Sequence, residues 1–292
     1  MPHKAGFVNI IGNPNAGKST LMNRLVGEKL SIITPKAQTT RHRILGIVNG
    51  DDYQMVFSDT PGIIKPAYEL HQMMMKQVGT AIEDADIILL IVELYARDTD
   101  AQTLEQLAKT ETPVIVVINK VDLLKEGDPS TEVQYWVKLL PKAEVIAVSA
   151  LRGFNTENLF THILKILPEH EGYYPKDDLT DKSERFFISE IIREKIFLNY
   201  DREVPYCCEV TVEDFQESDT LIKIRAIIHV ARDSQKGILI GHLGSAMKKT
   251  GTQARIDMEA WLGKKVFLDL QVKVSKDWRN NSNQLTRFGY NQ

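Results

Sequence analysis

Cysteine, long apolar runs and excess charge of one sign are all scarce in this chain. Its 292 residues include two cysteines, which are neighbours at Cys207 and Cys208 and favour a reduced, cytosolic chain over a disulfide framework. The best apolar run, residues 87–92, has the length of a strand and is too short to cross a membrane. The formal net charge of -3 gives no general nucleic-acid signal, so any basic surface must be local. We expect a cytoplasmic protein without a transmembrane segment.

A glycine-rich motif, GxxxxGKS, occupies residues 12–19, between the apolar run 7–11 and a helical pattern. In this strand-to-helix position the motif binds phosphates, because its backbone N–H groups and the helix N-terminus face the anion. We expect Lys18 to reach the β- and γ-phosphates and the Ser19 hydroxyl to bind Mg²⁺. The predicted nucleotide contacts are Gly12, Asn13, Asn15, Ala16, Gly17, Lys18, Ser19 and Thr20.

A second motif, Asp59-Thr60-Pro61-Gly62, follows an apolar strand predicted at 53–57. A carboxylate at the end of a strand can hold Mg²⁺ through water, and the Gly62 N–H can meet a γ-phosphate. Alone, this tetrapeptide is an ordinary turn signal. After a phosphate-binding loop, it predicts a sensor of the γ-phosphate.

The peptide Asn119-Lys120-Val121-Asp122 follows a continuous apolar run at 114–118, which indicates a buried parallel strand. Guanine presents N1–H and its exocyclic amine side by side, and a carboxylate such as that of Asp122 accepts from both. Adenine lacks this pair of donors, so the motif excludes the ATP-using enzymes with the same phosphate loop. Ser149-Ala150 can supply a backbone N–H to the guanine O6. The predicted guanine-site residues are Asn119, Lys120, Asp122, Ser149, Ala150 and Leu151.

The polar segment 34–42 has no periodicity and is typical of a mobile switch loop. A threonine hydroxyl there can complete the Mg²⁺ shell while the γ-phosphate is present, and we favour Thr40 over Thr39. The alternative is a surface loop that carries basic residues. The predicted catalytic residues are Lys18, Thr40 and Gly62, and the predicted metal ligands are Ser19, Thr40 and, through water, Asp59.

Position 63, directly after the Asp-Thr-Pro-Gly motif, holds isoleucine where Ras-like GTPases carry the glutamine that orients the attacking water. Because isoleucine cannot orient water, we expect slow intrinsic hydrolysis, with the water positioned by other groups or by a partner. As a further hypothesis, the amide oxygen of Asn15 holds a potassium ion that supplies the positive charge of an arginine finger.

Apolar strands expected at 7–11, 53–57, 87–92, 114–118 and 145–148 alternate with helical stretches near 18–27, 70–82, 100–110, 130–140 and 156–166. This alternation predicts an α/β domain with a mostly parallel, six-stranded sheet that binds its ligand at the carboxyl ends of the strands. The sixth strand, 44–48, lies too close to 53–57 for a crossover helix and is expected to pair antiparallel with it.

The chain is long enough for two domains, because a nucleotide domain uses about 150–170 residues. We place this domain at 1–168, a linker without periodicity at 169–184, and a second domain at 185–292. The second domain is expected to contain a helix at 185–200, strands at 206–213 and 221–230, a helix, Gly241-His242-Leu243-Gly244, another helix, and a strand at 265–274. That αββααβ order, with GxxG between two helices, is the α+β pattern of type II KH domains, which bind unstacked bases in a groove.

Residues 236–265 carry six Lys and Arg side chains against two acids, so the chain has a local basic patch beside the GxxG turn. The predicted RNA contacts are Gly241, His242, Leu243, Gly244, Lys248, Lys249 and Arg255. An alternative is a GTPase adaptor whose C-terminal domain binds a protein or a membrane surface, since anionic lipid also attracts a basic patch.

Several segments carry a family resemblance when they are taken together. They are the motifs at 12–19, 59–62 and 119–122, Lys36-Ala37-Gln38-Thr39-Thr40-Arg41-His42-Arg43, Ser189-Glu190-Ile191-Ile192-Arg193-Glu194-Lys195, Ile240-Gly241-His242-Leu243-Gly244 and the closing Phe288-Gly289-Tyr290. This set resembles the bacterial Era family of GTPases, over essentially the whole chain.

The resemblance implies GTP and GDP with Mg²⁺ as cofactors, and a KH domain that binds the 3′ end of small-subunit ribosomal RNA. It also implies a role in assembly of the small ribosomal subunit, with nucleotide state controlling access to RNA, and peripheral association of some members with the inner membrane. We expect a monomer. One departure is the centre of the GxxG turn, where the family often carries lysine and this chain has His242-Leu243. We therefore expect Lys248-Lys249 to carry more of the phosphate attraction.

Overall fold

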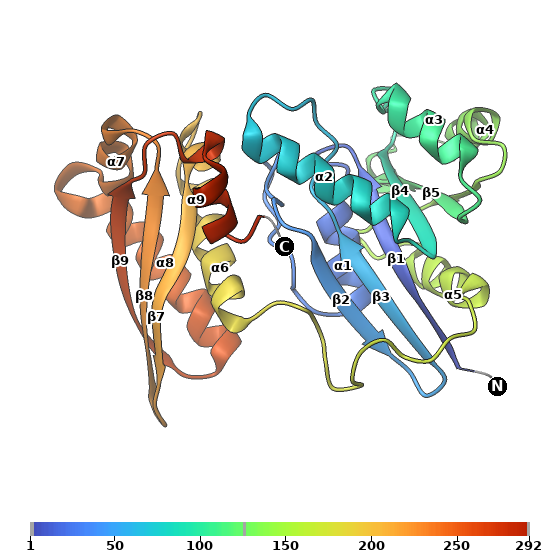
Figure 1. Cartoon of the computed structure of the whole chain (residues 1–292). Helices are drawn as coiled ribbons and strands as arrows, with labels where there is room; N and C mark the ends of the chain where they lie inside the picture. The colour runs from blue at the N-terminus through green and yellow to red at the C-terminus, as the bar shows by residue number, and fades with distance from the viewer. Residues whose placement is uncertain (1–2, 125–126, 291–292) are drawn as a thin grey trace. The chain divides into compact units, whose positions relative to one another are not determined.

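The computed structural model describes residues 3–124 and 127–290, which form two compact units. The first unit comprises the described residues up to Lys65 together with Met74–Asp181, and the second comprises Pro66–Met73 with the residues from Lys182 onward. Each unit has a sheet of its own (Figure 1).

The first unit contains a six-stranded sheet in the order β2-β3-β1-β4-β5-β6 (Figure 1). Its strands are β1 (Lys4–Gly12), β2 (Ile44–Asn49), β3 (Tyr53–Asp59), β4 (Ile87–Glu93), β5 (Val114–Asn119) and β6 (Glu144–Ala147). All neighbouring strands run parallel except β2 and β3, which pair antiparallel. The predicted α/β fold, with one antiparallel edge strand, is confirmed.

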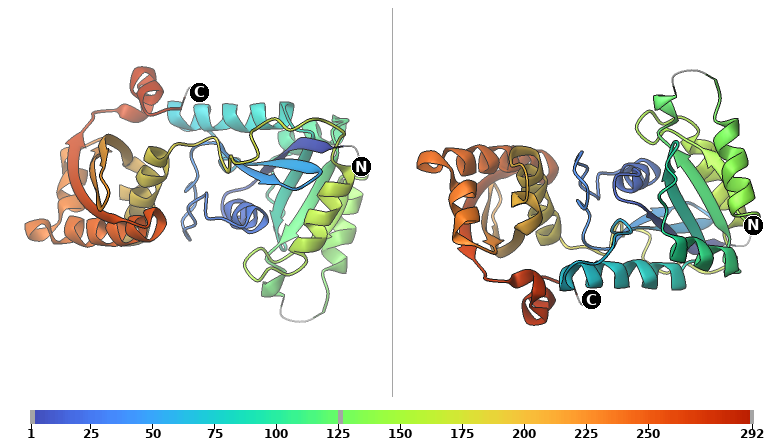
Figure 2. Two further views of the ribbon diagram at one scale, coloured as in Figure 1. Left: turned by 90° about the horizontal axis from the view of Figure 1, so that it is seen from below. Right: turned by 90° about the horizontal axis from the view of Figure 1, so that it is seen from above.

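Helices cover both faces of this sheet. They are α1 (Lys18–Val26), α2 (Glu69–Glu83), α3 (Ala101–Lys109), α4 (Ser130–Leu139) and α5 (Thr156–Ile166). Helices α2, α3 and α4 pack around an apolar cluster that includes Ile88, Leu90 and Trp136. Figure 2 shows α1 and α2 on opposite sides of the sheet. Because both faces are covered, β4 is buried along residues 87–92 and reads as one continuous apolar run.

The segment that follows α5 packs against the edge of the six-stranded sheet. The amide of Tyr173 donates to the Gln54 side chain at 2.6 Å, and the carbonyl of Leu179 accepts a hydrogen bond from the amide of Ile47 at 2.8 Å. The edge strand β2 offers unpaired backbone groups, and this segment satisfies part of them. The loss of periodicity that predicts a linker at 169–184 thus reflects, up to Asp181, an irregular strap on the first unit.

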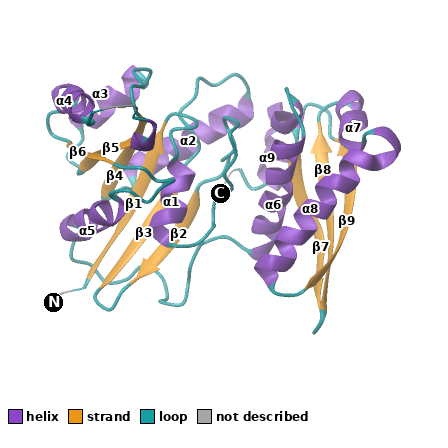
Figure 3. Ribbon diagram, turned by 180° about the vertical axis from the view of Figure 1, so that it is seen from behind, coloured by secondary structure: helices purple, strands orange, loops and turns teal. Residues whose placement is uncertain are grey.

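The second unit has a three-stranded sheet in the order β7-β8-β9, in which β7 and β8 pair antiparallel and β8 and β9 pair parallel. Its elements are α6 (Glu184–Asn199), β7 (Glu209–Glu217), β8 (Leu221–Val230), α7 (Asp233–Ile240), α8 (Ser245–Leu262), β9 (Lys265–Val274) and α9 (Ser282–Arg287). Helices α6 and α8 lie across one face of the sheet (Figure 3) and share an apolar core with it. This is the predicted αββααβ order of a KH domain.

Two details of the second unit differ from the sequence expectation. Strand β7 begins at Glu209 rather than near 206, because Val204–Cys207 forms a short 3-10 turn that contains Pro205. No pattern in the sequence predicts an element after β9, yet this segment is held in place: the Trp278 indole N–H donates to the Cys207 carbonyl at 3.0 Å. Both cysteines are buried, and their thiols donate to the Val204 carbonyl at 3.1 and 3.0 Å.

Candidate nucleotide site and nucleic-acid groove

The phosphate-binding loop joins β1 to α1 and depends on two glycines. Gly12 has φ +144°, and a Cβ there would lie 2.2 Å from the Ile91 carbonyl oxygen. Gly17 has φ +92°, and a Cβ there would lie 2.2 Å from Nδ2 of Asn119. Only glycine combines these backbone angles with such close approach. The loop therefore wraps tightly around the N-terminus of α1.

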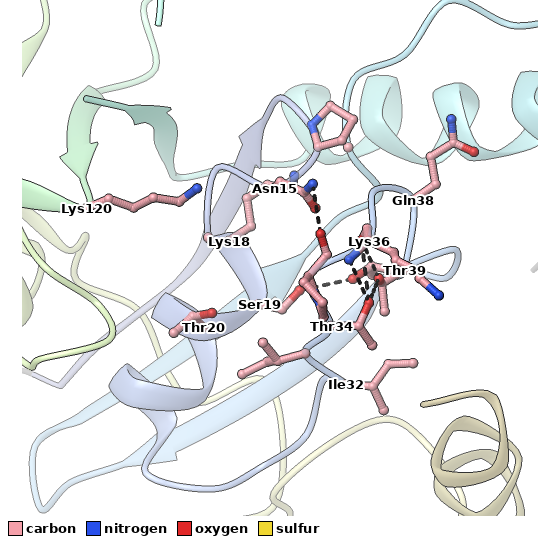
Figure 4. Close-up of a pocket in the computed structure, with 16 residues that line it drawn as sticks. Asn15, Lys18, Ser19, Thr20, Ile32, Thr34, Lys36, Gln38, Thr39 and Lys120 are labelled. Carbon is pink, nitrogen blue, oxygen red and sulfur yellow. Dashed lines mark hydrogen bonds between the residues drawn. The ribbon is translucent and has the colours of Figure 1, made fainter. Parts of the chain in front are cut away.

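A pocket of about 380 Å³ opens beside this loop (Figure 4). Its lining comes from three places: the phosphate loop, the predicted switch loop and the Asp-Thr-Pro-Gly turn, with Lys120 from the end of β5. The lining residues are Pro14, Asn15, Gly17, Lys18, Ser19, Thr20, Ile32, Ile33, Thr34, Pro35, Lys36, Gln38, Thr39, Thr40, Gly62 and Lys120. The structure thus brings together, in one cavity, most of the residues that the sequence predicts on the phosphate side of the site.

Lys18 is almost fully buried at the floor of this site. Its Nζ donates to the carbonyl oxygens of Gly12 at 3.0 Å and Asn13 at 2.8 Å. Burial lowers the pKa of Lys18 to about 8, and the nearby Asp59 carboxylate opposes that shift. The ammonium is therefore held ready for an anion, with only backbone oxygens to exchange for phosphate oxygens.

Ser19, Thr40 and Asp59 meet at one point. The Ser19 hydroxyl donates to Oδ2 of Asp59 at 2.7 Å and lies 3.0 Å from the Thr40 hydroxyl. Asp59 is completely buried, and burial raises the pKa of its carboxyl group, while the Ser19 hydrogen bond acts in the opposite direction. Within residues 3–124 and 127–290, its second oxygen, Oδ1, has no hydrogen-bond partner. Two hydroxyls and an unsatisfied carboxylate oxygen form a hard donor set that suits Mg²⁺.

The two threonines of the switch loop have different surroundings. Thr39 donates to the Lys36 carbonyl at 2.8 Å and lies 2.6 Å from the Thr34 hydroxyl, within the loop. Thr40 instead faces Ser19. The geometry therefore favours Thr40 as the metal-side threonine, which is the residue that the sequence argument prefers.

Asn119 ties the phosphate loop to the predicted guanine site. It is buried, its Nδ2 donates to the Ala16 carbonyl at 2.9 Å, and its Oδ1 accepts from the Ala150 amide at 3.0 Å. Asp122 lies beside the same loop and accepts a hydrogen bond from the Ser149 hydroxyl. The motifs at 119–122 and 149–151 therefore come together, although among them only Lys120 lines the phosphate pocket.

Two residues of α1 support the site and were missed by the sequence argument. Asn23 accepts from the amide of Leu30 at 3.0 Å and of Ser31 at 2.9 Å, which anchors the segment that leads into the switch loop. Arg24 donates to the carbonyl of Leu151 at 3.2 Å. In the sequence both look like ordinary polar residues of a surface helix, so no local signal identifies them.

A second pocket, of about 390 Å³, lies along α8 of the KH fold. It is lined by Gly244, Met247, Lys248, Gly251, Thr252, Arg255, Leu268 and Leu270. Of the predicted RNA residues, Gly244, Lys248 and Arg255 line this groove, whereas Gly241, His242, Leu243 and Lys249 do not. The additional α8 residues recur at spacings of three and four, and this helical period is a signal that could have found them.

The GxxG turn lies at one end of the groove, where Gly244 forms part of the lining. Gly241 has φ +70°, and a Cβ there would lie 2.6 Å from the Ala246 Cβ, so glycine permits the close approach of the next helix. Leu243 has φ +50° and is 93% exposed. Arg255 pairs with Glu259 at 2.8 Å, and among the residues that the structure describes no ion pair involves Lys248.

No helix in the described parts of the chain is long and apolar enough to cross a membrane.

A phosphate loop backed by a guanine-selective motif, followed by a KH fold, defines a GTPase with a nucleic-acid-binding domain. Residues 7–120 match a protein family described as 50S ribosome-binding GTPase, and residues 203–279 match the KH domain family. The chain is 44% identical to GTPase Era of Syntrophus aciditrophicus, over 99% of this chain and 96% of that protein, and 46% identical to GTPase Era of Geotalea daltonii, over 98% and 97%.

A solved structure of Era in complex with MgGDPNP and nucleotides 1506–1542 of 16S ribosomal RNA is also similar. It has a TM-score of 0.94 and 38% sequence identity, and the match covers 99% of both chains. The chain belongs to the Era family of GTPases, as the sequence motifs indicated.

Proposed function

We propose that GTP with Mg²⁺ occupies the pocket beside the phosphate loop. The main observation in support of this proposal is that Ser19, Thr40 and Asp59 converge next to the buried ammonium of Lys18. These three residues would hold Mg²⁺, Asp59 through water, and the metal supplies charge neutralisation on the phosphate oxygens. Lys18 exchanges its backbone partners for the β- and γ-phosphates, and the Gly62 N–H meets the γ-phosphate.

Guanine specificity is assigned to the carboxylate of Asp122, which accepts from N1–H and the exocyclic amine of the base. The Ser149 hydroxyl already donates to one oxygen of this carboxylate and so fixes its orientation. Asn119 holds the neighbouring loop at the correct place relative to Ala16. A backbone N–H of 149–151 serves the guanine O6.

Hydrolysis proceeds by direct attack of water, without a glutamine at the position after Gly62 to orient it. Ile63 takes the position after Gly62, and its amide donates to the Gly12 carbonyl at 3.0 Å. We infer slow intrinsic hydrolysis, assisted by a partner or by potassium at Asn15. The Asn15 amide nitrogen donates to the Pro35 carbonyl at 3.4 Å, which leaves the amide oxygen as the candidate ligand.

Hydrolysis rates in KCl and NaCl at equal ionic strength test the potassium assignment. We expect faster hydrolysis in KCl, and we expect Asn15→Ala to remove the difference while Lys142→Ala, an exposed lysine far along the chain, keeps it. Equal rates of the wild-type protein in the two salts would rule potassium out.

The proposed RNA ligand is the single-stranded 3′ end of small-subunit ribosomal RNA, and the proposed role is assembly of that subunit. Gly244, Lys248 and Arg255 line a groove of about 390 Å³, a size that suits unstacked bases, beside the turn that approaches the RNA backbone. The Era complex with 16S ribosomal RNA supports the same ligand. The family described as 50S ribosome-binding GTPase matches residues 7–120, and these residues precede the KH domain.

Filter binding of a 3′-terminal 16S fragment and of a shuffled control RNA tests this assignment. We expect selective binding that is lost in Gly244→Asp, because a carboxylate there repels the RNA backbone, and weakened in Lys248→Ala. Lys223→Ala, an exposed lysine on β8 that does not line the groove, serves as the matched control. If no nucleotide state bound RNA and the protein instead bound anionic vesicles or a protein partner, the adaptor alternative would replace the RNA assignment.

We further infer a monomer that acts in the cytoplasm, with a fraction bound peripherally at the inner membrane. The family resemblance supports the membrane-bound fraction, and the adjacent pair Cys207-Cys208 supports a reduced, cytoplasmic location. We also propose 1–168 and 185–292 as the two functional domains, with 169–184 connecting them.

A further inference from the structure

The loop between β4 and α3, residues 94–100, lies against the phosphate-binding loop. The Asn13 side chain donates through Nδ2 to the Asp98 carbonyl at 3.1 Å. At the start of the same loop, the Leu94 amide donates to the carbonyl of Asn119 at 3.1 Å. In both contacts the loop 94–100 uses backbone atoms, the Asp98 carbonyl and the Leu94 amide. The position of the loop backbone therefore decides where the Asn13 side chain is held.

Arg97 fastens this loop to α4. Its guanidinium donates to both oxygens of Glu132, at 2.7 and 2.6 Å, and lies over the Tyr135 ring with its central carbon 3.9 Å from the ring centroid. The Glu132 side chain is only 4% exposed, whereas that of Arg97 is 39% exposed. A bidentate pair that also stacks on a ring fixes the guanidinium in one geometry.

We propose that Arg97 is a positioning residue for the phosphate-binding loop of the GTPase. Glu132 and Tyr135 hold Arg97, Arg97 holds the loop, and the Asp98 carbonyl holds Asn13. The carbonyl of Asn13 itself accepts from Lys18 Nζ at 2.8 Å. A fixed loop therefore keeps both the Asn13 backbone and the Lys18 ammonium at the place where the β-phosphate binds.

A purely structural pair would stabilise α4 and α3 without favouring one part of the nucleotide over another. Positioning of the phosphate loop instead affects a ligand that carries a β-phosphate and leaves a monophosphate almost unchanged. GDP and GMP have the same base and sugar, so their affinities separate the two roles. This comparison also separates an effect on the phosphate loop from an effect carried by Leu94 to the guanine site.

Isothermal titration calorimetry of the full chain with GDP and with GMP is the test. We expect Arg97→Ala to weaken GDP binding by about tenfold, the scale of one lost hydrogen bond to a charged group, with GMP affinity within about twofold of wild type. Asn13→Ala should have a similar effect, and the double variant should be no weaker than either single variant, because both act on one contact. Lys109→Ala, an exposed lysine on α3, is the matched control and should bind both nucleotides as wild type does.

Arg97→Lys keeps the positive charge but cannot form the bidentate pair with Glu132. It should therefore weaken GDP binding nearly as much as Arg97→Ala does. This variant keeps the proposal testable if Arg97→Ala folds poorly. Equal losses for GDP and GMP, additive losses in the double variant, or wild-type GDP binding by Arg97→Lys would each overturn the proposal. None of these outcomes would affect the assignment of the nucleotide site itself, which the wild-type GDP titration measures.

Discussion

Replacing Asn119 by alanine should loosen the first unit at the junction between the phosphate and guanine sites. The substitution removes two hydrogen bonds at a side chain that is 2% exposed. It leaves the Ala16 carbonyl and the Ala150 amide, both belonging to buried residues, without these partners. An unsatisfied buried group costs about 1–3 kcal/mol. For the two together we expect a loss of about 2–6 kcal/mol in the free energy of local opening.

Amide hydrogen exchange followed by mass spectrometry on the nucleotide-free protein measures this loss where it occurs. Peptides from β5 should exchange faster by the amount that corresponds to the predicted free energy, because β5 carries Asn119 at its end. Peptides from β8, in the second unit, serve as an internal control and should not change. A loss below about 1 kcal/mol in β5 would refute the account, because it would mean that the two partners find other hydrogen bonds.

Three further predictions follow from the site. Asp122→Asn should shift preference from guanine to xanthine nucleotides, because an amide can donate to the xanthine C2 oxygen; competition binding with GDP and XDP measures this, and unchanged preference for GDP contradicts the assignment. GDP affinity should fall by about fourfold between pH of about 7 and about 8.5 in calorimetric titrations. The Lys18 pKa near 8 means that a growing fraction of the ligand-free protein has a neutral lysine, which must take up a proton before it can bind phosphate. A flat pH profile contradicts this role of Lys18. Lys248→Ala should reduce the slope of log affinity against log salt for RNA by about one, whereas Lys223→Ala should leave this slope unchanged.

The pH dependence of stability has the opposite sign to that of binding. Because burial depresses the folded-state pKa of Lys18 below the ordinary value of 10.5, the unfolded chain binds the proton more tightly between about 8 and 10.5. This group therefore makes the ligand-free protein more stable as the pH rises through that window. GDP affinity falls over the lower part of the same window, so the two measurements together identify the lysine.

The parts of the site that the sequence predicts are those carried by contiguous motifs. Residues 12–19 and 119–122 combine backbone geometry and chemistry in a few neighbouring positions, so their roles can be argued before the fold is known. The α/β order was also predictable, since the strands that end in motifs are mainly apolar and alternate with helical patterns.

The missed features are contacts between distant positions that look ordinary in the sequence. Asn23 and Arg24 fill polar positions on a helix, and Arg97 and Glu132 are an unremarkable charge pair until the fold brings them together. The hydrogen bonds that residues 173–179 make along the sheet edge are not predictable either, because hydrogen bonding to an open edge requires no periodic pattern. The contact of Trp278 with Cys207 likewise has no local signal in the sequence.

The most direct test of the account compares RNA affinity in the two nucleotide states. The affinity of the full chain for the 3′-terminal 16S fragment is measured by fluorescence anisotropy, once with Mg²⁺ and a non-hydrolysable GTP analogue and once with Mg²⁺ and GDP. We predict tighter binding in the GTP-analogue state, by about tenfold or more, and no selective binding by Gly244→Asp in either state. Equal affinity in the two states would contradict the claim that the nucleotide site controls the KH groove.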